Sequence, residues 1–171
     1  MHALVTAASR HGATHEIASA IAAGLARRGI EAEARPAEEL ETLDDYDAYV
    51  IGSAVYVGRW LDHARGLVET HAASLAERPV WLFSSGPLGP PDKLKPEGDP
   101  VDVAGLIETT DAVEHRTFAG RLDRTLLSFG EKAVVVAVRA PEGDFRDWEA
   151  IDRFAGDIAG HLRFEDRAEN Y

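Results

Sequence analysis

The chain has 171 residues and a formal net charge of −12, and it contains 45% hydrophobic residues, 28% charged residues and no cysteine. This length suits one domain with a full core, and the absence of cysteine excludes disulfides, thiolate metal sites and cysteine nucleophiles. The acidic balance argues against a nucleic-acid partner, since nucleic-acid binding depends on Lys and Arg.

Hydrophobic periodicity alternates between strand and helix through the first half of the chain. Ile17, Ile21 and Leu25 recur at the spacing of one buried helix face, and Gly29 follows as a helix stop. Asp47–Ser53 is a near-continuous apolar run, which fits a central strand of a parallel sheet. In chain order the predicted elements are strand His2–Ala7, helix Ala13–Arg28, edge strand Ile30–Arg35, strand Asp47–Ser53, helix Trp60–Ala73 and strand Pro79–Ser85.

The second half opens with a segment at 86–100 that carries five prolines and is predicted to be a surface excursion. Arg124–Val138 fits a helix or a strand extension, because its run of valines favours β structure locally. Asp144 or Asp147 is predicted to cap the helix that follows. The other predicted elements are helix Val101–Thr109, strand Ala112–Ala119, helix Asp147–Leu162 and a frayed acidic tail at 165–171.

This alternation predicts a three-layer α/β fold in which helices cover both faces of a parallel sheet. No repeat or domain boundary is evident, so residues 1–171 are expected to form one domain. In such sheets ligands bind at the carboxyl ends of the strands, beside the switch in strand order. Three loops reach that edge, namely Ser9–Thr14, Ser53–Arg59 and Ser85–Gly89.

The first of these loops joins a strand to a helix and predicts a phosphate site. Gly12 permits close approach of the backbone, and Ser9 and Thr14 offer hydroxyl groups. Arg10 and His11 add side chains that can donate charge-assisted hydrogen bonds beside the start of the helix. The alternative is an ordinary capped helix N-terminus.

The second and third loops have the composition expected around a flat conjugated ring. Tyr56 lies amid small residues in the second loop and is the better aromatic platform, whereas Trp60 is expected in the core. The third loop offers backbone groups to the edge of the ring, unless it is a plain Gly-Pro turn. The residues predicted to contact the ring are Ser53, Ala54, Val55, Tyr56, Val57, Gly58, Ser85, Gly86, Pro87, Leu88 and Gly89.

Other catalytic patterns are absent or weak. The seven histidines form no convincing metal pair, and the chain has no Gly-x-Ser-x-Gly elbow of a hydrolase. No apolar run approaches the roughly 18 residues that span a bilayer, so no integral membrane segment is expected. Met1–Val5 lacks the features of a secretory signal. A cytoplasmic location is expected.

Taken together, the three loops resemble those of the flavodoxin family, in which Ser9, Gly12 and Thr14 match the phosphate loop. Arg10-His11 departs toward the branch of menaquinone-dependent protoporphyrinogen dehydrogenases, whose loop reads Thr-Arg-Asp-Gly-Gln-Thr. Further ordered matches to that branch are Tyr46-Asp47 with Val50–Ser53, Tyr56–Gly58, Phe118–Leu122 and Asp147–Glu149. The resemblance covers nearly the whole chain.

The resemblance implies a five-stranded flavodoxin sheet of order 2-1-3-4-5 that binds FMN noncovalently. Ser9, Arg10, His11, Gly12, Ala13 and Thr14 would hold the 5′-phosphate. Tyr56 with its neighbours and Ser85–Gly89 would flank the isoalloxazine ring. Catalysis would be the flavin's own, so no catalytic side chain is expected.

Three functions follow from these observations. The first is an FMN-dependent oxidoreductase related to the protoporphyrinogen enzymes, with a quinone or porphyrin-like substrate. That branch carries a long basic, aromatic insertion after its fifth strand, whereas Asp123–Lys132 is short here. The second is an electron carrier whose acidic surface docks on a basic redox partner, and the third is a binding domain that has lost the flavin.

Overall fold

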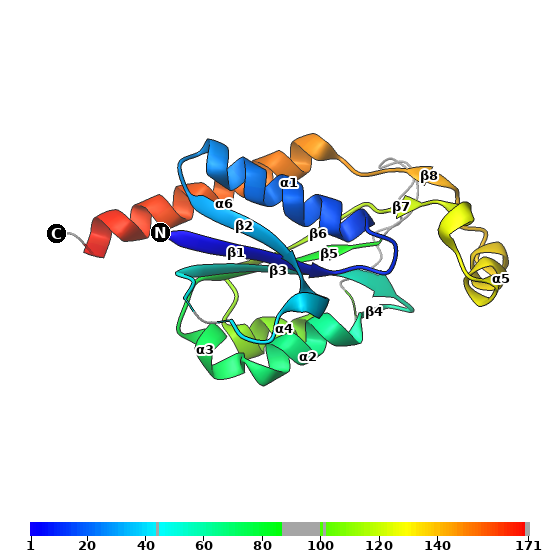
Figure 1. Ribbon diagram of the computed structural model, residues 1–171, viewed down its shortest axis with the longest axis horizontal. Coiled ribbons are helices and arrows are strands. Elements are labelled where there is room, and N and C mark those ends of the chain that lie inside the picture. The colour runs from blue at the N-terminus through cyan, green and yellow to red at the C-terminus, as the bar shows by residue number, and fades with distance from the viewer. Residues whose placement is uncertain (44, 87–99, 101, 170–171) are drawn as a thin grey trace.

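A parallel sheet forms the centre of the protein, as the computed structural model shows for residues 1–43, 45–86, 100 and 102–169 (Figure 1). The main strands run in the order β2-β1-β3-β5-β6, and β4 pairs with β3 beside them. This confirms the predicted order, since the five main strands are the five that the sequence indicated. Their bounds are β1 His2–Ala8, β2 Glu31–Pro36, β3 Ala48–Tyr56, β4 Arg59–Trp60, β5 Val80–Ser85 and β6 Glu114–Phe118.

Two layers of helices cover the sheet, one on each face (Figure 1). α1 (Ala13–Arg27) and α6 (Trp148–Glu169) lie on one face. The other face is covered by α2 (Asp62–Thr70), α3 (Ala72–Ala76) and α4 (Val103–Thr110). The three-layer prediction is therefore confirmed. The 3₁₀ turns η1 and η2 span Ala37–Glu39 and Arg124–Leu126.

Each face of the sheet has its own apolar core, because alternate residues of a strand point to opposite sides. Val5 of β1 packs in the cluster formed with α1 and α6, whereas Leu4 packs in the cluster formed with α2 and α4. Trp81 and Phe83 are buried in the first cluster. Burial of a side chain of this size contributes about 1.5–3 kcal/mol or more to stability.

The end of α1 follows its sequence signal closely. Gly29 adopts a left-handed φ of +79°, its N–H donates to the Ala26 carbonyl at 3.0 Å, and the Ile30 N–H donates to the Leu25 carbonyl at 3.1 Å. This pair of hydrogen bonds is the Schellman motif that a glycine favours. The chain then turns directly into β2, which lies at the sheet edge as predicted.

The segment after β3 differs from the prediction of a loop leading into a helix at Trp60. β3 continues to Tyr56, and Val57 and Gly58 then form a turn in which φ is +50° and +71°. Because two consecutive residues with positive φ form a tight hairpin, Arg59 and Trp60 pair back on β3 as β4. Trp60 is buried as expected, and its indole N–H donates to the Ser84 hydroxyl at 2.8 Å.

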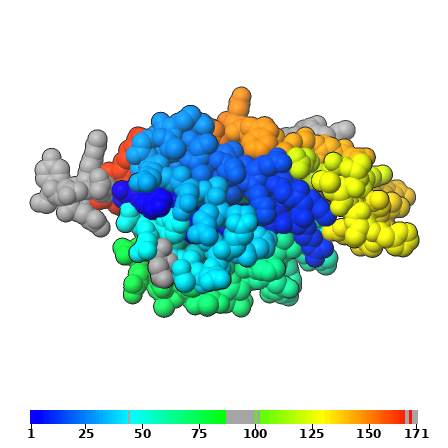
Figure 2. Space-filling view, in the orientation of Figure 1, coloured from blue at the N-terminus to red at the C-terminus, as the bar shows by residue number. Residues whose placement is uncertain are grey.

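The open prediction for Arg124–Val138 is decided in favour of a helix, α5 (Phe129–Ala137). Ser128 and Glu131 form a reciprocal capping box at its start. α5 contributes no buried residue to the core, and it projects from one end of the molecule (Figures 1 and 2). It is joined to the body through a two-stranded ribbon of β7 (Arg121–Leu122) and β8 (Gly143–Asp144).

The last helix is longer than predicted, because α6 runs to Glu169 and includes residues 165–169 of the expected tail. No glycine or proline follows Gly160, and His161 contacts Glu165 one turn later at 3.1 Å. Asp147 caps this helix, since its Oδ1 accepts from the Ala150 N–H at 2.9 Å.

The proline-rich surface excursion expected at 86–100 lies almost entirely outside the described residues.

Candidate functional site

The loop between β1 and α1 presents unused backbone donors at a helix N-terminus. Gly12 is the N-cap of α1 with φ +84°, and the Thr14 N–H donates to the Ser9 hydroxyl at 3.3 Å. The N–H groups of residues 10–13 take no acceptor from the part of the chain that the structure describes. Because these donors coincide with the positive end of the helix dipole, the loop favours an anion.

The side chains of Arg10 and His11 in this loop both contact one carboxylate from α5. Arg10 Nη1 lies 3.3 Å and His11 Nε2 3.1 Å from Oε1 of Glu131. Oε2 of Glu131 accepts from the Ser128 N–H at 2.8 Å. This N–H is the largest cause that lowers the pKa of Glu131 to about 2, and the side chains of Ser128, His11 and Arg10 add to it. Glu131 is therefore charged at neutral pH.

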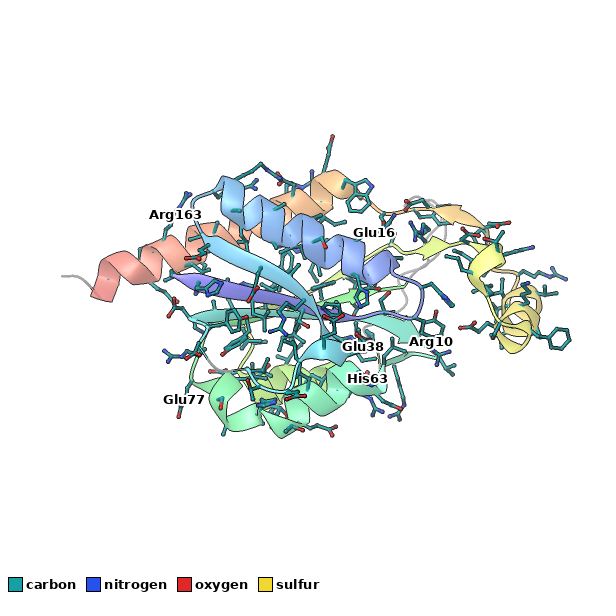
Figure 3. All side chains as sticks on the ribbon, viewed as in Figure 1. Arg10, Glu16, Glu38, His63, Glu77 and Arg163 are labelled. Atoms are coloured by element: carbon teal, nitrogen blue, oxygen red, sulfur yellow. The ribbon has the colours of Figure 1, made fainter. Side chains whose placement is uncertain are left out.

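Tyr56 lies at the end of β3 beside the same loop. The Arg10 guanidinium carbon lies 4.3 Å from the centroid of its ring, within cation–π distance. Figure 3 labels Arg10 at the end of the molecule that carries α5. Burial raises the pKa of Tyr56, and the neighbouring Glu131 charge acts in the same direction. The phenol is therefore neutral at physiological pH and supplies an aromatic surface.

These groups surround a cavity of about 430 Å³ at the carboxyl edge of the sheet. Its size falls within the range of small-molecule sites. The loops after β1, β3 and β5 supply polar groups to its lining, and the segment between β7 and β8 supplies apolar side chains, namely Leu127, Val134, Val135 and Val138. The lining residues are Ser9, Arg10, His11, Ala13, Thr14, Ala54, Val55, Tyr56, Val57, Ser85, Gly86, Gly120, Arg121, Leu122, Leu127, Gly130, Glu131, Val134, Val135, Val138 and Ala140.

The cavity brings together most of the residues predicted from the three loops. Ser53 does not line it, because it is fully buried and its hydroxyl donates to the Ala54 carbonyl and accepts from the Leu61 N–H. Gly12 and Gly58 also lie outside the lining and act on the course of the backbone. The predicted contacts Pro87, Leu88 and Gly89 lie outside the described residues.

The wall from Gly120 to Ala140 was missed from the sequence. One signal was available for Gly120, because it follows the fifth predicted strand and so belongs to the same sheet edge. The Ser128…Glu131 capping box was a second signal, which marks the start of a helix. Neither signal indicates that the helix folds back toward the first loop.

Arg146 fixes this wall to the start of α1. Its side chain is 3% exposed, donates to Glu16 at 2.7 Å and to the Ala13 carbonyl at 3.1 Å, and bonds both carboxylate oxygens of Asp144. Asp144, considered above as a helix cap, is therefore the main partner of Arg146. The N-terminus of α1 and the β7–β8 ribbon are thus held together beside the cavity.

The positions of the histidines and carboxylates show whether the site is built for a metal ion. Across the described residues, no three His, Asp or Glu side chains are grouped to hold a metal ion. His11 and His15 contact different carboxylates, Glu131 and Glu38, at 3.1 and 3.4 Å. None of the helices in the described ranges is long and apolar enough to cross a membrane.

Known proteins resemble the chain along nearly its full length. The model of a family described as "Flavodoxin domain" matches residues 4–149. A protoporphyrinogen IX dehydrogenase (quinone) of Escherichia coli strain K12 is 25% identical over an alignment of 175 positions, which covers 95% of this chain and 96% of that protein.

Solved flavodoxins share the fold. A flavodoxin from the domain Archaea superposes with a TM-score of 0.65 at 16% identity, over 95% of this chain and 99% of that one. An oxidised flavodoxin from Bacillus cereus gives a TM-score of 0.59 at 14% identity, over 94% and 99% of the two chains. At these identities the likeness concerns the fold alone.

Proposed function

Because the chain belongs to the flavodoxin-domain family, we propose that it is a flavoprotein that binds FMN in the cavity beside Tyr56 and acts as an oxidoreductase. The observation that carries the proposal is the run of N–H groups at residues 10–13, which have no acceptor among the described residues and lie in the loop that borders the same cavity as Tyr56. A phosphate and a conjugated ring joined in one ligand fit these two features. FMN has both.

In this proposal the chain's residues bind and orient the cofactor. Ser9–Thr14 would hold the 5′-phosphate, with Gly12 giving the backbone its left-handed turn. Residues 54–57 and 85–86 would flank the isoalloxazine, joined by Pro87, Leu88 and Gly89. FMN supplies reversible one- and two-electron transfer when it is bound. The valines of α5 would exclude water from that region.

We propose that the activity is of the protoporphyrinogen dehydrogenase type, with a porphyrin-like or quinone substrate. The similarity to the Escherichia coli enzyme over 95% of this chain supports it. The apolar wall of the cavity also fits a largely apolar substrate better than a docking protein. We propose in addition that residues 1–171 act as one domain, since both apolar clusters share one sheet.

The alternative is a flavodoxin-type electron carrier. The net charge of −12 favours it, because an acidic surface attracts basic redox proteins at long range. The two functions differ in their response to salt. Reduction by a basic reductase should slow as salt screens the charges, whereas oxidation of a small substrate should change little.

The visible absorption spectrum of the purified protein tests the cofactor. We expect the bands of a bound flavin, and chromatography of the extracted flavin should identify FMN. Protein that stays colourless after incubation with excess FMN would contradict the proposal and favour a flavin-free binding domain. Oxidation of protoporphyrinogen with a quinone acceptor then tests the enzyme, and salt-dependent reduction without that oxidation would support the carrier.

A further inference from the structure

The carboxylate of Glu131 contacts the side chains of both Arg10 and His11, in the loop that is proposed above to bind phosphate. We propose that Glu131 competes with the ligand's phosphate group for Arg10 and His11, and so sets how strongly the protein prefers a phosphorylated flavin. This inference rests on the proposed function and assigns a specificity-determining role to a residue of α5. Glu131 itself belongs to α5 and lies outside the three loops that are proposed to bind the ligand.

Two of the contacts of Glu131 are to side chains that an anion in this loop would also reach. One of its oxygens receives Arg10 at 3.3 Å and His11 at 3.1 Å. Its other oxygen is held by the Ser128 N–H at 2.8 Å. The side chain is only 18% exposed, so water screens its interactions less than those of a free surface carboxylate.

The charges of Arg10 and Glu131 explain why Glu131 would affect the binding of a phosphate. With Glu131 in place, the charge of Arg10 is already neutralised by a carboxylate of the chain. An arriving phosphate therefore relies on the N–H groups of residues 10–13, and it meets the negative charge of Glu131 as well. Riboflavin lacks the phosphate, so Glu131 has no charge-based effect on its binding.

Arg10 also connects this competition to the aromatic side of the cavity. Its guanidinium lies 4.3 Å from the centre of the Tyr56 ring while it bonds Glu131. A phosphate that draws Arg10 away from Glu131 would thus change the contacts of Tyr56 and of α5 together. Phosphorylated ligands should therefore affect α5 more than riboflavin does.

The test uses Glu131→Gln, which removes the charge while Gln can still cap the helix at this position. A matched control is Glu142→Gln. Glu142 accepts a hydrogen bond from the Arg124 N–H in the segment between β7 and β8, which also contains α5, and it lies outside the cavity lining. Thermal unfolding of each variant establishes that it is folded. Fluorescence titrations then measure the dissociation constants of FMN and riboflavin for the full chain and both variants.

We expect Glu131→Gln to bind FMN about five- to tenfold more tightly than the parent chain, the size of one or two partly exposed ion pairs. Riboflavin affinity should stay unchanged, and Glu142→Gln should match the parent for both ligands. Unchanged or weaker FMN binding by Glu131→Gln would overturn the inference while leaving the proposed function intact. An equal gain for riboflavin would also overturn it.

A second measurement tests, in the absence of flavin, whether Glu131 competes with an anion. Inorganic phosphate is titrated into each protein while the His11 ring signals are followed by NMR. Glu131→Gln should respond at lower phosphate concentration than the parent chain, and equal responses would overturn the inference. If no variant binds flavin, the proposed function fails, and this titration still tests the competition between Glu131 and an anion.

Discussion

Replacing Gly12 by aspartate tests whether the loop after β1 binds a phosphate. Gly12 has φ +84°, and a Cβ placed there meets no atom within 4 Å. A side chain therefore fits in space, and its backbone cost is about 1 kcal/mol because Asp and Asn tolerate the left-handed region best. Gly12→Asn bears the same cost without the charge, so the pair of variants isolates electrostatic repulsion.

The size of the repulsion follows from Coulomb's law. A carboxylate about 5 Å from a dianionic phosphate in a water-like dielectric is unfavourable by about 1.5–2 kcal/mol, and by more where water is excluded. This corresponds to an FMN dissociation constant about 20-fold higher for Gly12→Asp than for Gly12→Asn. Riboflavin should bind both variants alike.

Flavin fluorescence titrations at one ionic strength measure these constants, and thermal unfolding verifies that the two variants are equally stable. FMN binding of equal strength in Gly12→Asp and Gly12→Asn would refute the assignment of this loop to the phosphate. A loss of riboflavin affinity in Gly12→Asp alone would refute it too, because the charge would then be acting on another part of the ligand.

The remaining predictions concern stability and are measured by urea unfolding. Gly52→Ala should lower the free energy of unfolding by about 2 kcal/mol or more, because the added Cβ would lie 2.2 Å from the buried Phe83 ring. An unchanged urea midpoint would contradict this packing. Val57→Asn should raise the free energy of unfolding by about 1 kcal/mol, since Val57 is 96% exposed and strained at φ +50°. A lower urea midpoint would argue against backbone strain at this residue. The pKa of Glu131 is about 2, below its ordinary 4.5. The stability advantage over Glu131→Gln should therefore be full above pH 4.5 and disappear as the pH falls toward 2; an advantage independent of pH would exclude ionisation as its source.

The fold was largely predictable because its signals are local. Apolar runs such as Val50–Ile51 mark central strands, the spacing of Ile17 and Ile21 marks a helix face, and Gly29 marks its end. Trp60 was placed in the wrong element because the turn before it depends on Val57 in a left-handed conformation. A β-branched residue gives no sequence signal for that conformation.

Sequence alone determined the alternation of strands and helices and the three loops at the carboxyl edge of the sheet, because short-range patterns and the topology of parallel sheets fix them. The strand order came from the resemblance of those loops to the flavodoxin family. Only the tertiary structure decided what faces those loops. Glu131 lies 121 residues from Arg10 along the chain, and no periodicity relates residues so far apart. Their contact exists because Arg146 and the β7–β8 ribbon hold the segment between β7 and β8, which contains α5, against the start of α1.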